Sequence, residues 1–287
     1  MEAFGLLIAF ALTVVLVLIN MSFIYPLPIS DIGAVRYRTM PLMTYVLIII
    51  NSLVFIVWQA PDYYRAFDVL ANQREALTLL QLYVDKIWTY GYRAIFMTEG
   101  QSIGAFTTFT SMFMHGDLWH LFGNMIFLWT FGRRIEDACG PWRYLLFYLC
   151  AGMVANIGAE VLNPANIDIP SVGASGAIAG LMGAFLVLFP RTQIQCLWFL
   201  GGLLSVPVRA IRGIEPAFSR NVVLPAWVLL IYFGIRDLLP SLQTITQGDF
   251  DGGVSNLAHL MGYLAGLLIM LFVRKDLLMR VVQRRTA

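Results

Sequence analysis

The sequence predicts an all-α membrane protein, a polytopic helical bundle with a six-helix core and one additional transmembrane helix at its amino terminus. Hydrophobic residues make up 59% of the 287 residues and charged residues only 13%. A soluble globular domain has about 45–50% apolar and about 25% charged residues. The chain also contains several apolar runs of membrane-spanning length, separated by links that differ in their content of basic residues. Lipid therefore has to cover much of the protein surface.

Seven apolar runs are long enough to span a bilayer, because a helix needs about 20 mostly apolar residues to cross the hydrocarbon core. They are 4–25, 42–59, 116–132, 143–163, 172–190, 223–241 and 254–273. An eighth apolar stretch, Ile194 to Val208, is interrupted by Gly201, Gly202 and Pro207. Such residues break regular structure, so we expect this stretch to lie at the membrane interface or to be re-entrant.

The basic residues lie in alternate links, which gives the expected orientation. Lysine and arginine concentrate in short links that face the cytoplasm. Links one, three and five and the carboxyl-terminal tail contain Arg36, Arg38, Arg133, Arg134, Arg191, Arg209, Arg212, Arg220, Arg274, Lys275, Arg280, Arg284 and Arg285. The short fourth link, 164–171, contains neither Lys nor Arg. We therefore expect the amino terminus outside and the carboxyl terminus in the cytoplasm.

The best domain boundary is marked by Pro26, Pro28 and Gly33. It predicts a transmembrane helix and linker over residues 1–41, followed by a six-helix domain with a cytoplasmic tail over residues 42–287. The first apolar run has no basic segment before it and no small-residue cleavage site, so we interpret it as a retained span. It also lacks the Arg-rich and Ser-rich composition of an organelle transit peptide, which favours a bacterial inner membrane.

The charge and cysteine content exclude other classes. A net charge of +2 gives no indication of nucleic-acid binding. The three cysteines, Cys139, Cys150 and Cys196, form no CxxC pair. We expect them to pack as small apolar residues, without a disulfide framework.

All three histidines, His115, His120 and His259, fall at the outer ends of predicted spans. Ionisable groups at such a depth are costly and usually functional. From the helical rise, Ser175 lies about 6 Å below the outer end of its helix, His120 and His259 about 8 Å, and Asn124 about 13 Å. Polar side chains from three helices are therefore expected in one outer layer.

Small residues recur at four-residue spacing after Ser175 and beside His259, where they include Gly262 and Gly266. Such stripes let transmembrane helices pack closely. A serine hydroxyl becomes a nucleophile when an adjacent base takes its proton, and the amino end of a helix favours a developing oxyanion. These features predict an acyl-transfer site without a metal. His115 and His120 diverge around their helix, which also disfavours a metal site.

Three runs resemble the signature motifs of the rhomboid intramembrane serine proteases. They are His115-Gly-Asp-Leu-Trp-His120-Leu-Phe-Gly-Asn124, Gly173-Ala-Ser175-Gly176 and Ala258-His259-Leu-Met-Gly262-Tyr-Leu-Ala-Gly266. Their order and the spans that carry them also agree with that family, over residues 42–274. The resemblance implies that Ser175 is the nucleophile and His259 the general base, a dyad with no carboxylate.

The resemblance also implies an oxyanion hole and a substrate class. His120, Asn124 and the backbone N–H of Ser175 would bind the oxyanion. Structural roles near the site would fall to His115, Gly173, Gly176 and Gly262. Rhomboid proteases cleave transmembrane protein substrates near the outer face of the bilayer, without a cofactor. The expected partners are such substrates and the lipid bilayer, with no metal or nucleic acid; the natural substrate and the oligomeric state are left open.

The sequence departs from the family at three places, and two other functions stay open. Phe106 and Thr107 stand where many members have Trp-Arg, Ala179 stands where some have an aromatic residue, and the segment 191–222 is longer than usual. One alternative is a rhomboid-like protein that binds transmembrane clients without cleaving them. The other is a transporter or proton-coupled channel built around Glu160 and the histidines, although no inverted repeat supports it.

Overall fold

The computed structural model describes residues 25–32, 39–69, 72–99, 104–163, 168–213, 220–247 and 256–273. The chain divides into two compact units. The larger unit comprises residues 36–190 and 230–287, and the smaller one residues 1–35 and 191–229. The predicted first span, 4–25, lies outside the described residues except for Tyr25.

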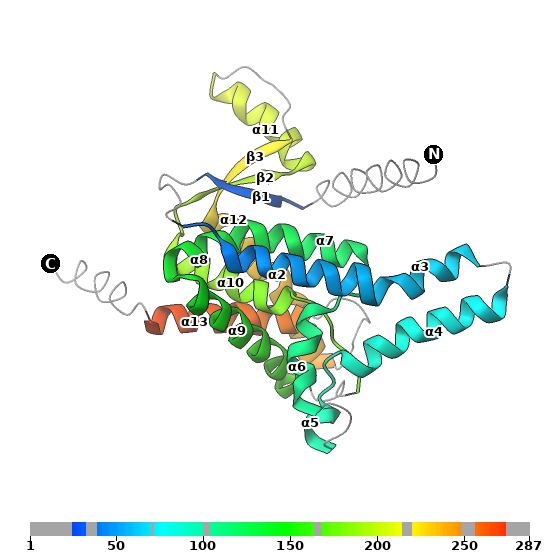
Figure 1. Ribbon diagram of the computed structural model, residues 1–287. Coiled ribbons are helices and arrows are strands. Elements are labelled where there is room, and N and C mark those ends of the chain that lie inside the picture. The colour runs from blue at the N-terminus through cyan, green and yellow to red at the C-terminus, as the bar shows by residue number, and fades with distance from the viewer. Residues whose placement is uncertain are drawn as a thin grey trace. The chain divides into compact units, whose positions relative to one another are not determined.

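The larger unit is mostly helical, which confirms the predicted fold class. Its elements are α2 (Leu42–Leu53), η1 (Val54–Gln59), α3 (Ala60–Asp68), α4 (Gln73–Tyr90), α5 (Ile95–Glu99), η2 (Gly104–Phe106), α6 (Thr107–Thr110), η3 (Ser111–Phe113), α7 (Leu118–Phe127), η4 (Leu128–Gly132), α8 (Arg133–Cys139), α9 (Pro141–Leu162), α10 (Ser175–Leu188), most of α12 (Ala226–Gln247) and α13 (Asn256–Val273) (Figure 1).

Helix α10 is the central helix of this unit. Every residue from Gly176 to Phe185 is buried, and α9 and α13 pack against it (Figure 1). A Cβ atom at Gly180 would lie 2.5 Å from the Ala151 Cβ and 3.3 Å from the Gly262 carbonyl oxygen. The small residues recognised in the sequence therefore let the backbones of three helices approach one another.

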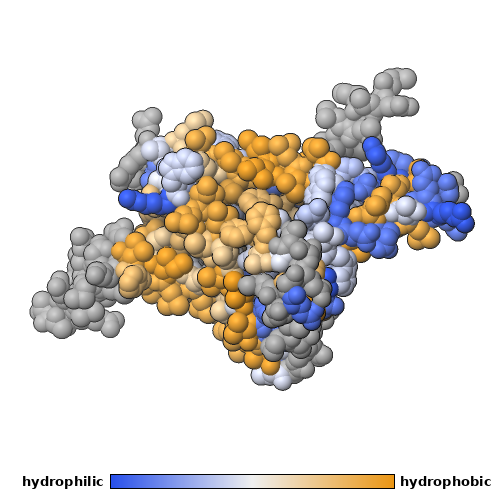
Figure 2. Space-filling view, turned by 60° about the horizontal axis from the view of Figure 1, so that its bottom comes forward, coloured by the Kyte–Doolittle hydropathy of each residue, from blue (hydrophilic) through white to orange (hydrophobic). Residues whose placement is uncertain are grey.

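In the described part of the chain, four helices are long and apolar enough to cross a membrane: Leu42–Asp68, Pro141–Leu162, Ala226–Thr246 and Asn256–Val273. They expose large apolar side chains, among them Trp142, Val161, Leu268 and Phe272, which are between 61% and 82% exposed. Figure 2 shows apolar side chains over the bundle and hydrophilic ones over the α3–α4 hairpin at its right. A large exposed apolar surface of this kind requires lipid. The chain is therefore an integral, multi-pass membrane protein.

Two further predicted spans correspond to shorter helices. The span 116–132 contains α7 and η4, and the span 172–190 contains α10, which has 14 residues. The total of seven spans stays a prediction.

The helix that begins at Leu42 is longer than the predicted span 42–59, because it continues through η1 and α3 to Asp68. Helix α4 then runs back beside α3 (Figure 1), and Lys86 Nζ lies 2.5 Å from Asp62 Oδ2. The second link is thus largely helical. The apolar run ends where polar residues begin, but a change in polarity does not end a helix.

The carboxylate of Glu136 on α8 connects that helix to the beginning of α2. It is buried and accepts hydrogen bonds from the backbone N–H groups of Met43 and Thr44 and from the Thr44 hydroxyl, each 2.8 Å long. The first N–H groups of a helix have no acceptor within it, and their partial positive charge favours a carboxylate. Glu136 therefore caps α2 from a distant part of the chain.

The smaller unit contains a three-stranded antiparallel sheet, which was not predicted. Its strands are β1 (Leu27–Ile32), β2 (Gln193–Leu197) and β3 (Asn221–Pro225), with β2 in the middle. Ser30 pairs with Gln195, and Ile194 pairs with Leu224. The side chains of Ile194 and Cys196 are fully buried.

The sheet and the helix that follows it change the interpretation of two segments. Residues 27–32, which were expected to be linker, form a strand. The stretch Ile194 to Val208 is divided between β2 and α11 (Phe199–Ile211), with Gly201 packed on the Trp198 ring. Polar and apolar residues alternate in β2, as a strand requires. This alternation covers only five residues, so it is not visible as a long apolar run.

Candidate active site

Ser175 is the first residue of α10, and the turn before it depends on Gly173. Gly173 has a φ of +130°, a conformation that favours glycine, and its backbone N–H donates to the Ser111 carbonyl over 2.9 Å. A Cβ atom there would lie 2.7 Å from His120 Nε2 and 3.5 Å from Ser175 Oγ. Gly173 therefore leaves a small space that both side chains border.

His120 is held at the beginning of α7 with a defined tautomer. The Asp117 carboxylate caps this helix by accepting the His120 backbone N–H over 2.8 Å. His120 Nδ1 accepts the Gly116 backbone N–H over 3.5 Å. The hydrogen-bond network thus assigns the ring proton to Nε2. This Nε2 atom is buried and has no hydrogen-bond partner among the described residues.

Asn124 follows His120 by one helical turn and lies on the same face of α7. Its side chain is buried, and its Nδ2 atom also has no partner in the described part of the chain. Two side-chain N–H donors from α7 are therefore available on one face of this helix.

His259 lies on α13, whose backbone is in close contact with α10. A Cβ atom at Gly262 would collide with the Gly176 carbonyl, and one at Gly176 would lie 3.8 Å from the Ala258 carbonyl oxygen. His259 Nε2 is buried but bonds to no other described residue. Ser175 and His259, which the resemblance implies to be a dyad, are therefore not hydrogen-bonded to each other here. Catalytic hydrogen bonds are often long before substrate binds.

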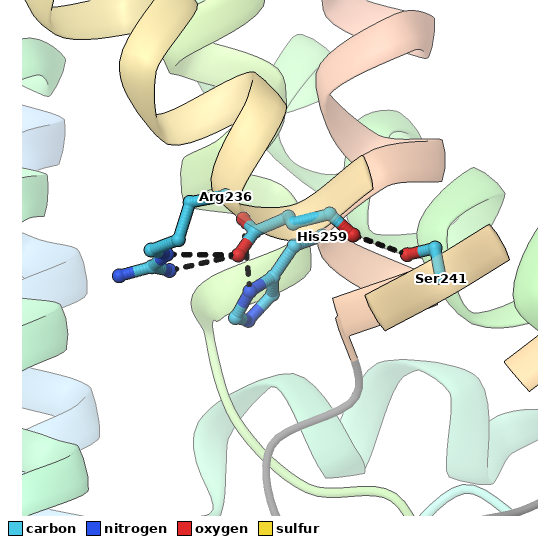
Figure 3. Close-up of polar contacts among 4 residues, drawn as sticks. Arg236, Ser241 and His259 are labelled. Carbon is cyan, nitrogen blue, oxygen red and sulfur yellow. Dashed lines mark hydrogen bonds and ion pairs between the residues drawn. The ribbon is translucent and has the colours of Figure 1, made fainter. Parts of the chain in front are cut away.

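A carboxylate lies beside His259, and its involvement was not predicted. Asp237 Oδ2 on α12 is 3.4 Å from His259 Nδ1. Arg236 donates from Nε and Nη2 to the other oxygen, Oδ1, over 3.1 and 2.9 Å (Figure 3). The resemblance implied a dyad with no carboxylate, whereas the structure places one at the imidazole. The signal was present: Asp237 is ionisable and lies within the predicted span 223–241, where such residues are usually functional.

His115 is fully buried and is fixed through its backbone. Its N–H donates to Gln59 Oε1 over 3.1 Å, and Gln59 Nε2 donates to its carbonyl. The Tyr83 hydroxyl donates to the next carbonyl, that of Gly116, over 2.5 Å. The His115 ring packs edge-on against the ring of His120, with centroids 5.2 Å apart. These contacts connect the segment before α7 to α4 and η1.

Glu160 on α9 accepts a hydrogen bond from the Tyr92 hydroxyl. Burial and this carboxylate raise the pKa of Tyr92. Backbone hydrogen bonds pair Tyr92 with Ser171, and Arg93 forms an ion pair with Asp168. Glu160 therefore helps to attach the second link to α9 and to the segment that leads into α10.

The fold and the site define a multi-pass membrane protein in which a serine, two histidines and an asparagine come from three helices, α10, α13 and α7. A model of the Rhomboid domain matches residues 104–276. That match covers more than half of the chain and includes Ser175, His259, His120 and Asn124. The chain belongs to the rhomboid family.

Curated relatives agree with this assignment. The chain is 28% identical over 155 residues to Rhomboid protein 1, mitochondrial, of Saccharomyces cerevisiae, covering 53% of this chain and 38% of the relative. It is 42% identical over 77 residues to Rhomboid protease GluP of Bacillus subtilis, covering 27% and 14%. It is 31% identical over 166 residues to Rhomboid-like protein 11, chloroplastic, of Arabidopsis thaliana, covering 58% and 51%. The chain thus spans about half of their lengths or less.

Proposed function

We propose that this protein is an intramembrane serine endopeptidase that cleaves transmembrane protein substrates near the outer face of the bilayer, with Ser175 as nucleophile. One observation carries the proposal. Three buried nitrogen atoms, on His120, Asn124 and His259, have no partner among the described residues. Buried polar atoms without partners are costly; the carbonyl oxygen of a substrate at Ser175 would accept from His120 and Asn124, and His259 Nε2 would accept from the Ser175 hydroxyl. The name of the Bacillus subtilis relative, a rhomboid protease, supports the same reaction.

The two histidines have tautomers that suit opposite tasks. His259 Nδ1 faces the Asp237 carboxylate, so the lone pair is on Nε2, which can accept a proton. His120 carries its proton on Nε2 and can donate it in a hydrogen bond. His259 therefore serves as the base, and His120 serves as an oxyanion donor.

In the first half-reaction, Ser175 Oγ bonds to the scissile carbonyl carbon while its proton passes to His259 Nε2. The electron pair of the carbonyl double bond moves to oxygen. His120 Nε2–H, Asn124 Nδ2–H and the Ser175 backbone N–H stabilise this oxyanion. When the tetrahedral intermediate collapses, the C–N bond breaks and the leaving amine takes the proton from His259.

In the second half-reaction, water attacks the acyl-enzyme. His259 takes a proton from the water, and the new C–O bond forms as in the first attack. Collapse then breaks the bond to Ser175 Oγ, which regains its proton from His259. These steps use the side chains of Ser175, His259, His120 and Asn124, the Ser175 backbone N–H and water.

Covalent labelling tests this proposal directly. The purified protein in detergent is incubated with a fluorophosphonate probe, and cleavage of a single-span model substrate is measured in parallel. We expect labelling at Ser175 and loss of both signals in Ser175→Ala. In His259→Ala we expect cleavage to be abolished while the protein still inserts and folds. Labelling that persists in Ser175→Ala would remove this serine as nucleophile, and undiminished cleavage in His259→Ala would identify another base.

The same experiment separates cleavage from client binding. A rhomboid-like protein without protease activity would retain the substrate uncleaved, and its Ser175→Ala variant would behave like the wild type.

For the orientation in the membrane, we propose that the carboxyl terminus faces the cytoplasm, because basic residues concentrate in alternate links. A reporter fused after Ala287 should be active only in the cytoplasm. An exported, active reporter would contradict this topology.

A further inference from the structure

We propose that Asp237 is a positioning residue for His259, which holds the imidazole so that Nε2 faces the Ser175 hydroxyl as a proton acceptor. The proposal rests on the proposed function of Ser175 and His259. It adds a third side chain to a site for which the sequence resemblance implied only two catalytic residues.

The contact joins two helices inside the bundle. Asp237 on α12 and His259 on α13 are both buried, with side chains 12% and 10% exposed, and Asp237 Oδ2 lies 3.4 Å from His259 Nδ1. Figure 3 shows the imidazole beside α12, with its Nδ1 directed at the carboxylate. Because Nδ1 is occupied in this way, the ring presents its other nitrogen, Nε2, away from α12.

The carboxylate itself is fixed by Arg236 on the same helix. Neighbouring residues of a helix do not normally face each other, but the long side chain of Arg236 folds back so that two of its nitrogens bind Asp237 Oδ1. These contacts leave Oδ2 facing His259. The Ser241 hydroxyl instead donates to the Asp237 backbone carbonyl over 2.6 Å and does not contact the carboxylate.

Arg236 also explains how an ionised carboxylate is retained at this depth. A buried charge without a partner is strongly destabilising. The Arg236 side chain is 40% exposed, so it neutralises Asp237 while keeping part of its guanidinium group at the surface. One oxygen of the carboxylate serves this ion pair, and the other serves the imidazole.

The arrangement fits the proton transfer of the proposed reaction. Asp237 accepts Nδ1–H, which fixes the tautomer in which Nε2 has the free lone pair. When Nε2 takes the Ser175 proton, the imidazolium ion lies beside a negative charge. Asp237 stays ionised throughout and forms no bond to substrate. It therefore acts on the rate through His259 alone.

The test compares Asp237→Asn, Asp237→Glu and Ser241→Ala in the full-length protein. Asp237→Asn removes the charge and keeps the shape, Asp237→Glu keeps the carboxylate, and Ser241→Ala disturbs α12 without touching the carboxylate. The substrate is a single-span model protein in proteoliposomes, and a fluorophosphonate probe counts the active sites. For Asp237→Asn we expect kcat per labelled site to fall about tenfold to a thousandfold, with KM within about twofold of the wild-type value.

The other two variants distinguish positioning from a general effect on the fold. Asp237→Glu should recover part of the lost kcat, and Ser241→Ala should keep the wild-type kcat. A second readout is the rate of probe labelling in a His259→Ala background. There Asp237→Asn should cause no further slowing, because a residue that acts through His259 has no effect when His259 is absent.

The outcomes separate this inference from the proposed function. If the wild type neither cleaves nor labels, or if Ser175→Ala still cleaves, the proposed function fails. If wild-type cleavage depends on Ser175 and His259 but Asp237→Asn keeps the wild-type kcat, only the positioning role fails. An equal loss of kcat in Asp237→Asn and Asp237→Glu would also overturn the positioning role. So would a slower rate of probe labelling when Asp237→Asn is added to His259→Ala.

Discussion

Gly262 on α13 lies against the backbone carbonyl of Gly176 on α10, so the helix that carries His259 is in direct contact with the helix that begins with Ser175. No side chain separates the two backbones at this point. The distance between the proposed nucleophile and its base therefore depends on the absence of a Cβ atom at residue 262.

The first prediction concerns this contact. In Gly262→Val, the added side chain would collide with the Gly176 carbonyl and crowd Ala155 Cβ, 3.3 Å from the new Cβ. Overpacking costs about 1–3 kcal/mol, and separation of the helices should lower kcat by at least about tenfold, because small misplacements of catalytic groups are costly. Thermal unfolding in detergent and substrate cleavage measure the two effects.

A matched control is available on α12. A Cβ atom at Gly234 would meet the Tyr263 ring at 3.7 Å, an ordinary contact. Gly234→Ala should therefore leave cleavage unchanged. Equal effects of the two substitutions would contradict the special role of the contact between Gly262 and Gly176.

The second prediction concerns the oxyanion donors. Asn124→Ala removes a buried amide whose Nδ2 has no partner among the described residues. Loss of one such donor lowers kcat by about 100-fold to 1,000-fold, and we expect little loss of stability because no described hydrogen bond of Nδ2 is broken. Cleavage kinetics and the thermal midpoint are the measurements.

Asn51→Ala is the control for this substitution. Asn51 is fully buried, but its Nδ2 donates to the Leu47 carbonyl over 2.7 Å. Its replacement should lower the thermal midpoint and leave kcat per folded molecule intact. The reverse pattern in the two variants would remove Asn124 from the oxyanion hole.

The third prediction concerns the cap of α2. The Glu136 carboxylate accepts three hydrogen bonds from Met43 and Thr44. The amide of Glu136→Gln has only one acceptor oxygen and brings an N–H₂ group toward buried N–H donors. We expect a loss of about 1–3 kcal/mol in unfolding free energy, measured by denaturation in mixed micelles. The exposed Glu75→Gln should change it by less than about 0.5 kcal/mol; a similar loss there would contradict the proposed cap.

The fourth prediction concerns the attachment of the second link. Tyr92→Phe removes the hydroxyl that donates to Glu160, so the segment 72–99 should be cut faster by an added protease. Tyr90→Phe, which removes a hydroxyl from an exposed ring, should not increase cutting by the added protease.

Glu160→Gln should keep substrate cleavage, because the Glu160 carboxylate serves to attach the second link. Loss of ion or proton flux in Glu160→Gln, with cleavage absent from the wild type, would favour a transporter.

The parts of the molecule that follow from residue type and spacing were predictable. Small residues after Ser175 and around His259 predicted the close packing of α10 and α13, and the structure confirms it at Gly176 and Gly262. The helical class and the apolar character of the longer helices follow from composition. The catalytic roles themselves stay predictions until the serine is labelled.

Other features could not be obtained from spacing alone. Asp237 meets His259 through a side-chain contact between α12 and α13, as Tyr263 meets the Leu230 carbonyl, and no local pattern encodes such a tertiary relationship. The sheet pairs residues 27–32 with 193–197, which are more than 150 positions apart. The extension of the first helix of the bundle to Asp68 was missed because apolar runs indicate contact with lipid, whereas helices continue into water.

The central position of β2 has a practical consequence for the length of the protein. Each hydrogen-bonding edge of this strand pairs with a neighbouring strand, one edge with residues 27–32 and the other with residues 221–225. A chain shortened to begin at residue 42 would lack β1. The N–H and C=O groups on that edge of β2 would then be unpaired and available to pair with a strand of another molecule. The shortest form that stays monodisperse is therefore expected to begin before Leu27, well ahead of the matched Rhomboid domain.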